Sequence, residues 1–124
     1  MKKKITGSVV ALVTPMLEDE SIDFKSLSKL VELHCSSNTS GLVIVGTTGE
    51  SPTVDLEEHI KVIESAKNIA GDRIPIIAGT GANSTSEAIF LTREAERIGV
   101  DASLQVTPYY NKPSQAGLER HFLS

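Results

Sequence analysis

Four short apolar runs alternate with longer amphipathic segments along this 124-residue chain. The runs begin near residues 8, 42, 74 and 102, and the one at 42–45 is the most apolar. Continuous apolar runs of this length are typical of strands that are buried on both faces of a parallel sheet. Because a helical pattern follows each run, the order is βαβαβαβα, which implies right-handed parallel crossovers. The first prediction is therefore an α/β fold.

Capping residues and apolar spacing mark the expected helices. Each helical pattern follows a residue whose side-chain oxygen can accept a hydrogen bond from the first helical turn. These residues are Asp23, Asp55, Ser84 and Ser114. Glu87 lies three residues after Ser84, which predicts a capping box. The expected inner faces are Leu27, Leu30, Val31 and His34, then Leu56, Ile60, Ile63 and Lys67, then Ala88, Leu91, Ala95 and Ile98.

Each expected strand also ends in a polar loop that contains threonine, glycine or asparagine, whereas the loops before the strands show no comparable pattern. Parallel strands end at one edge of a sheet, so these loops share a rim, like the functional face of a (β/α)8 barrel. The four βα units predict that residues 1–124 are the N-terminal half of a single barrel domain. The last helical pattern stops after about ten residues without a stop signal, so we expect a segment of a longer protein.

The loop Gly46-Thr47-Thr48-Gly49-Glu50-Ser51 follows the most apolar strand. Two adjacent hydroxyls beside glycines can bind an anion through side-chain and backbone donors. Alternatively, the loop is a tight turn whose threonines satisfy only backbone groups. The residues alone leave both interpretations open.

Composition narrows the function classes. The net charge of −4 does not indicate a basic surface for binding nucleic acid. No apolar stretch approaches the length of a membrane span. The single Cys35 excludes an internal disulfide and fits a reducing cytoplasm. No metal site is indicated, because CxxC and HxxxH motifs and carboxylate clusters at metal spacing are missing.

A dinucleotide site is the competing reading of Gly79-Thr80-Gly81-Ala82-Asn83-Ser84, which follows a strand and opens a helix. The third glycine of that fingerprint is replaced by Ser84. The candidate ribose-binding acid, Asp101, precedes a strand instead of following one. Both departures disfavour dinucleotide binding.

The four strand-end sequences, taken in order, resemble the dihydrodipicolinate synthase family over essentially the whole chain. They are Val13-Thr14-Pro15, Gly46-Thr47-Thr48-Gly49-Glu50-Ser51, Ala78-Gly79-Thr80-Gly81-Ala82-Asn83 and Val106-Thr107-Pro108-Tyr109-Tyr110-Asn111-Lys112-Pro113. The second and fourth of these sequences are specific to this family when they occur together. Singly, each is shared with N-acetylneuraminate lyases and keto-deoxy-sugar-acid aldolases, which remain alternatives.

The resemblance implies a lyase of the class I aldolase type on a (β/α)8 barrel. In that family a lysine forms a Schiff base with pyruvate, and the enamine attacks L-aspartate 4-semialdehyde. The product is 4-hydroxy-tetrahydrodipicolinate, in lysine and diaminopimelate biosynthesis. No external cofactor is expected, because the pyruvate is held covalently. The resemblance further implies a cytoplasmic homo-oligomer, a dimer of dimers, that binds neither nucleic acid nor membrane.

By residue match, the resemblance places Thr47 and Thr48 around the pyruvate carboxylate. Thr47 and Tyr110 match members of a proton-relay triad, in which Tyr110 reaches across a dimer interface. A hydroxyl relay passes protons without placing a charge in the pocket. The plainer alternative is that Tyr109 and Tyr110 only pack at an interface.

The resemblance also implies a feedback site for L-lysine at that interface. Glu87 suits the ammonium group, and Asn83 suits a carboxylate. Leu56 replaces a second histidine that some lysine-sensitive members use. A role for Glu87 in its capping box is compatible with this reading. The matching residues are Ser51, Pro52, His59, Asn83, Glu87 and Tyr109.

The family's Schiff-base lysine lies beyond residue 124, as do a further tyrosine of the relay and an arginine. A class I aldolase needs a desolvated lysine, and no expected strand here carries one. Lys112 is nearest to the expected face, and its turn context predicts exposure. We therefore expect the 124-residue chain to be inactive alone, and a non-catalytic half-barrel that serves in assembly is a third alternative.

Overall fold

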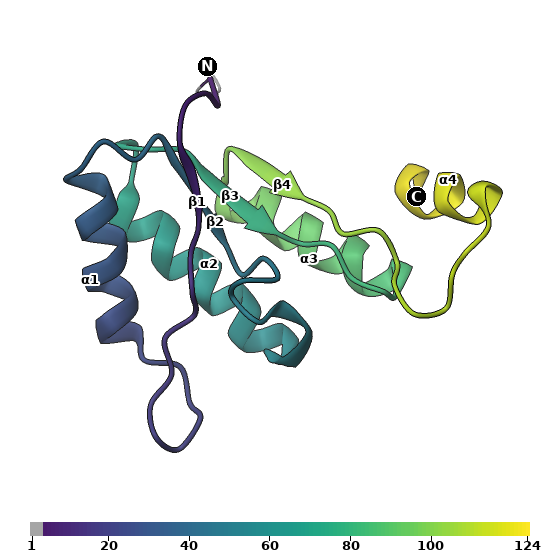
Figure 1. Cartoon of the computed structure of the whole chain (residues 1–124), viewed down its shortest axis with the longest axis horizontal. Helices are drawn as coiled ribbons and strands as arrows, with labels where there is room; N and C mark the ends of the chain where they lie inside the picture. The colour runs from purple at the N-terminus through teal and green to yellow at the C-terminus, as the bar shows by residue number, and fades with distance from the viewer. Residues whose placement is uncertain (1–3) are drawn as a thin grey trace.

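One open parallel sheet organises the computed structural model, which describes residues 4–124 (Figure 1). Its strands are β1 (Val9–Ala11), β2 (Gly41–Ile44), β3 (Ile76–Gly79) and β4 (Ala102–Leu104), in the spatial order β1-β2-β3-β4. All three strand pairs are parallel. The predicted βα order is confirmed. Strands β1, β3 and β4 are shorter than their apolar runs, and β2 begins and ends one residue earlier than its run.

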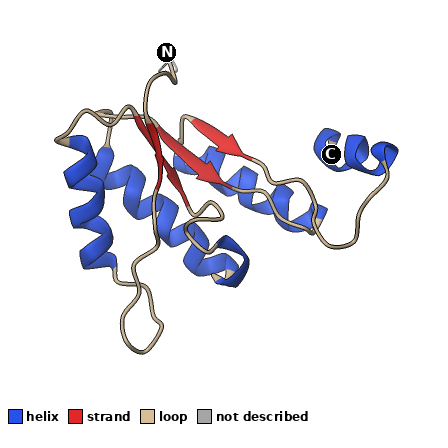
Figure 2. Cartoon of the chain, viewed as in Figure 1, coloured by secondary structure: helices blue, strands red, loops and turns tan. Residues whose placement is uncertain are grey.

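The helices are α1 (Phe24–Cys35), α2 (Leu56–Ala70), α3 (Thr85–Ile98) and α4 (Gln115–Leu123), with a short 3-10 turn, η1 (Ser51–Thr53). The first three helices lie along one face of the sheet, and α4 stands at the far end from α1 (Figure 2). None of the helices in residues 4–124 is long and apolar enough to cross a membrane.

Three of the four predicted N-caps are confirmed. A side-chain oxygen of Asp23 accepts from the amide of Ser26 at 2.9 Å, and Asp55 and Ser114 cap α2 and α4 in the same way. The prediction of a capping box at Ser84 and Glu87 is wrong. Ser84 stands at the N-cap of α3 without a capping hydrogen bond, and its hydroxyl lies 3.0 Å from that of Ser86. Two neighbouring hydroxyls satisfy one another there.

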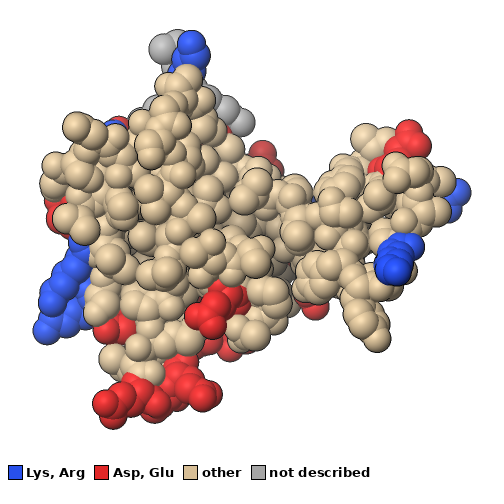
Figure 3. All heavy atoms as spheres, in the orientation of Figure 1, with Lys and Arg blue, Asp and Glu red and all other residues tan. Residues whose placement is uncertain are grey.

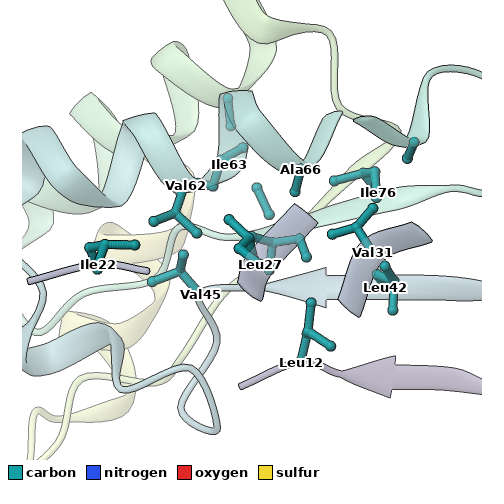
Figure 4. Close-up of a cluster of buried hydrophobic side chains, with 14 of the residues drawn as sticks. Leu12, Ile22, Leu27, Val31, Leu42, Val45, Val62, Ile63, Ala66 and Ile76 are labelled. Carbon is teal, nitrogen blue, oxygen red and sulfur yellow. The ribbon is translucent and has the colours of Figure 1, made fainter. Parts of the chain in front are cut away.

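The core fills the space between the sheet and helices α1 and α2 (Figure 4). Leu27 and Val31 of α1 meet Leu42 of β2 and Ile63 of α2, and all four are almost fully buried. Full burial of side chains of this size stabilises the fold by about 1.5–3 kcal/mol each. The core thereby fixes the two central strands, β2 and β3, whose ends carry the site.

Two burial predictions need correction. The central strands are buried at every position, but Val9 of β1 is 37% exposed and Leu104 of β4 is 52% exposed. These are edge strands, and the helices of the described chain cover only one face of the sheet. In α2 the buried stripe is shifted: Leu56 is 37% exposed, whereas His59 is buried. A neighbouring stripe with the small residues Ala66 and Ala70 faces the sheet instead.

Charge is scattered over the surface. Figure 3 shows separate Lys and Arg side chains and a group of Asp and Glu side chains over the loop between β1 and α1. No extended basic face is seen in this view, which fits the net charge of −4.

Candidate active site

The loop 46–51 leaves the carboxyl end of β2 in an unusual backbone conformation. Val45, which is β-branched and 1% exposed, has φ +52°, and Glu50 has φ +61°. Such values are rare outside glycine, so the surrounding structure must impose them. The amide of Gly49 donates to the carbonyl of Gly46, and that of Glu50 donates to Thr47, both at 3.0 Å. A tight, internally bonded turn therefore carries the two threonines.

Thr47 and Thr48 both expose their side chains. Neither hydroxyl makes a hydrogen bond within residues 4–124. Hydroxyls that are not needed by the fold are free to meet a ligand. The observation argues against a turn whose threonine hydroxyls satisfy backbone groups of the described chain.

A cavity of about 780 Å³ lies beside this loop, at the carboxyl ends of β2, β3 and β4. Ligand sites in α/β sheets occupy this edge. Most of the predicted site residues line it: Thr47, Ser51, His59, Asn83, Glu87 and Tyr109. Pro52 and Leu56 line it too, whereas Thr48 and Tyr110 do not. The structure thus joins one predicted catalytic residue and the predicted effector residues in a single cavity.

His59 forms a buried wall of this cavity. Its side chain is 1% exposed, and its Nε2 donates to the carbonyl oxygen of Gly79 at 2.6 Å. Burial lowers the pKa of the imidazole, and the bond to Gly79 opposes that shift. Burial therefore favours the neutral ring, whose Nε2 proton is donated to the end of β3.

The loops after β3 and β4 are joined through Asn83. Its Oδ1 accepts a hydrogen bond from the amide of Tyr109 at 2.8 Å, which leaves the amide nitrogen of the side chain for a ligand. The next residue, Tyr110, is 97% exposed and has φ +71°. The Tyr110 ring is therefore almost wholly uncovered by the rest of the described chain.

Sequence reasoning gave no role to two buried threonines. Thr14 is 5% exposed, and its hydroxyl donates to the carbonyl of Gly49 at 2.7 Å. Thr80 is fully buried, and its hydroxyl accepts from Nε2 of Gln105 at 2.6 Å and lies 2.9 Å from that of Thr92. A polar residue at the end of an apolar run was the available signal in both cases.

As predicted, no strand within residues 4–124 carries a lysine. Lys112 is exposed in its loop, and Lys67 lies 3.4 Å from a carboxylate oxygen of Asp101. The described residues also contain no group of three or more metal-binding side chains.

Comparison with known proteins decides which family has this arrangement. The family model for the dihydrodipicolinate synthetase family matches residues 4–124. The chain belongs to this family. The 4-hydroxy-tetrahydrodipicolinate synthase of Laribacter hongkongensis is 58% identical over 118 residues, which are 95% of this chain and 40% of that protein. The chain thus spans about two fifths of the length of the curated relatives it matches.

Solved dihydrodipicolinate synthases have the same fold over this region. The chloride-inhibited Acinetobacter baumannii enzyme, crystallised with pyruvate, is 59% identical and has a TM-score of 0.93 over 96% of this chain and 41% of its own. The Cyanidioschyzon merolae enzyme with lysine bound is 39% identical, with a TM-score of 0.90 over 98% of this chain and 42% of its own. These matches confirm the predicted family and a partial (β/α)8 barrel.

Proposed function

We propose that this chain is the N-terminal part of a (β/α)8 lyase that condenses pyruvate with L-aspartate 4-semialdehyde to give 4-hydroxy-tetrahydrodipicolinate. One observation carries the proposal: in a member of this family, Thr47, whose hydroxyl makes no hydrogen bond within residues 4–124, lines a cavity at the carboxyl edge of the sheet. The solved Acinetobacter relative, described as complexed with pyruvate, supports the choice of substrate.

In this proposal the loop 46–51 receives the pyruvate carboxylate. Thr48 contributes its amide and hydroxyl as donors, and Thr47 contributes its hydroxyl both to the carboxylate and to a proton relay. Adjacent backbone and hydroxyl donors in a turn form a suitable concavity for an anion. The lysine that forms the imine with pyruvate comes from the part of the barrel after residue 124, so the 124-residue chain alone is inactive.

Tyr110 is the second relay member that we assign to this chain. Its 97% exposure and left-handed backbone present the ring to a neighbour. A second subunit is the neighbour that we propose, in a homo-oligomer that is a dimer of dimers. We place the protein in the cytoplasm, where the proposed biosynthetic step belongs.

L-lysine is the proposed effector of the same cavity. Glu87 and Asn83 line it together and offer a carboxylate for an ammonium group and an amide for a carboxylate. Ser51, His59 and Tyr109 complete the proposed site. The relative that was solved with lysine bound supports this choice.

The test uses the complete protein that contains this chain. Condensation of pyruvate with aspartate semialdehyde is measured beside cleavage of N-acetylneuraminate, and we expect only the first activity. Replacing Thr47 by Val or Tyr110 by Phe should lower kcat about a hundredfold, as for loss of a proton relay. Thr53→Val is the control, since Thr53 is exposed and, among the described residues, its side chain bonds only to Glu50 of its own turn. Cleavage without condensation would assign the protein to the sugar-acid lyases instead.

Feedback is tested with the variant Glu87→Gln. It should weaken lysine inhibition at least tenfold and leave the uninhibited rate within about twofold, because the loss of one charged hydrogen bond is confined to the effector. Unchanged inhibition in this variant would remove Glu87 from the effector site.

A further inference from the structure

The two threonine hydroxyls of the loop 46–51 have no bonds of their own within residues 4–124. Their positions therefore depend entirely on the backbone that carries them. That backbone begins at Val45, a buried β-branched residue at φ +52°. A residue of this type adopts the left-handed region only when its surroundings enforce it. Contacts from the surrounding chain must therefore hold the loop in place.

Two side chains bond to this loop within the described residues. Thr53 donates to the carbonyl of Glu50 at 3.0 Å, but it is exposed and only three residues away. Thr14 donates to the carbonyl of Gly49 at 2.7 Å, is buried, and lies 35 residues away. The second bond therefore ties the loop after β2 to the end of the neighbouring strand β1.

Close packing reinforces the tie. A Cβ placed on Gly49 would lie 2.8 Å from the hydroxyl oxygen of Thr14, 3.0 Å from Cα of Val45 and 3.2 Å from the carbonyl oxygen of Leu12. The loop thus rests directly on the end of β1. Without the Thr14 hydroxyl, a buried carbonyl would lose its partner, which costs more than the bond itself contributes.

We infer that Thr14 is a positioning residue for the pyruvate site: its hydroxyl fixes the carbonyl of Gly49 and thereby the directions of the Thr47 and Thr48 hydroxyls. Thr14 does not touch the substrate in this inference and acts only through the loop. The inference rests on the proposed function for its effect on pyruvate, but its structural part does not.

The experiment compares Thr14→Val, Thr14→Ser and Thr53→Val in the complete protein. Valine keeps the shape and removes the hydroxyl, whereas serine keeps the hydroxyl. We expect Thr14→Val to lower kcat/KM for pyruvate about tenfold, mainly through KM, with the KM for the aldehyde substrate changed less than about twofold. The kcat/KM of Thr14→Ser for pyruvate should lie within about threefold of the parent value. That of Thr53→Val should equal the parent value.

Hydrogen–deuterium exchange of the segment 46–51 is measured on the same proteins, because it does not depend on activity. Exchange there should accelerate in Thr14→Val and not in Thr53→Val. If Thr14→Val folds poorly, the comparison of Thr14→Ser with Thr14→Ala gives the same readouts. Unchanged exchange overturns the inference, and so does a lowered melting temperature with an unchanged KM for pyruvate. If the parent protein does not use pyruvate, the proposed function fails, and the exchange result alone decides the role of Thr14.

Discussion

Adding one methyl group at Gly79 should disturb both the fold and the proposed pyruvate site. A Cβ on this residue would lie 2.2 Å from the carbonyl oxygen of Val45 and 2.8 Å from Cα of Gly46. Ordinary Cβ contacts begin at 3.4 Å, so the ends of β2 and β3 must separate by about 1 Å. Backbone atoms cannot swing aside as a flexible side chain can. We therefore expect Gly79→Ala to cost about 1–3 kcal/mol of unfolding free energy.

The same displacement moves the loop that begins at Gly46. A misplacement of about 1 Å in a catalytic constellation can cost about a hundredfold in rate, so kcat/KM for pyruvate should fall by up to that factor. Gly117→Ala is the control. Its Cβ meets only atoms at 3.4 Å and 3.5 Å, and it lies in helix α4, where alanine is favoured by up to about 1 kcal/mol.

Urea unfolding and pyruvate kinetics of the complete protein check both expectations. Each kcal/mol lost corresponds to about 2–4 °C in Tm for a domain of 150–250 residues. Gly79→Ala should have a lower unfolding free energy than Gly117→Ala and a lower kcat/KM for pyruvate. Parental stability and a parental KM for pyruvate in Gly79→Ala would refute the close approach of the two strand ends and its link to the site.

Three further perturbations test the fold around the site. Burial lowers the pKa of His59, so the unfolded chain takes up a proton first, and stability should fall as the pH drops below about 6.5, by up to about 1.4 kcal/mol per pH unit. His59→Gln should remove this slope in denaturant titrations at several pH values; a slope that persists would assign the titration elsewhere. Asp101→Asn should lower the unfolding free energy, measured in urea, by about 1–2 kcal/mol. The carboxylate accepts hydrogen bonds from the Ile76 amide at 3.0 Å and from the Lys67 ammonium at 3.4 Å. Leu27→Ala, at a side chain 1% exposed, should cost about 2–5 kcal/mol by calorimetry, and a loss below about 1 kcal/mol would contradict its place in the core.

Local signals were sufficient for the order of the elements and for most of their limits. Asp23, Asp55 and Ser114 cap the helices as predicted, since a cap depends only on neighbouring amides. The glycines at 71 and 99 end α2 and α3, both with positive φ. Buried strands were recognised correctly in the centre of the sheet. At its edges the apolar run alone could not show that one face of β1 and β4 lacks a cover within the described chain.

The candidate site was less accessible to sequence reasoning, because it depends on contacts between distant residues. The loop 46–51 was identified from its hydroxyls and glycines. The hydrogen bond from Thr14 to Gly49 could not be predicted, since the two residues are 35 positions apart in the sequence. His59 fell outside the expected stripe of α2, because a period of 3.6 residues allows adjacent stripes and only the sheet selects one. The failed capping box at Ser84 reflects competition from the hydroxyl of Ser86.

Borohydride trapping with pyruvate, followed by intact mass measurement, tests the central claim most directly. It is applied to the complete protein and to the isolated 124-residue chain. We predict that the complete protein gains one pyruvate, less one water and plus two hydrogens, on a lysine after residue 124, and that the isolated chain gains nothing. An adduct on the isolated chain, or none on the complete protein, would contradict the proposed division of the site.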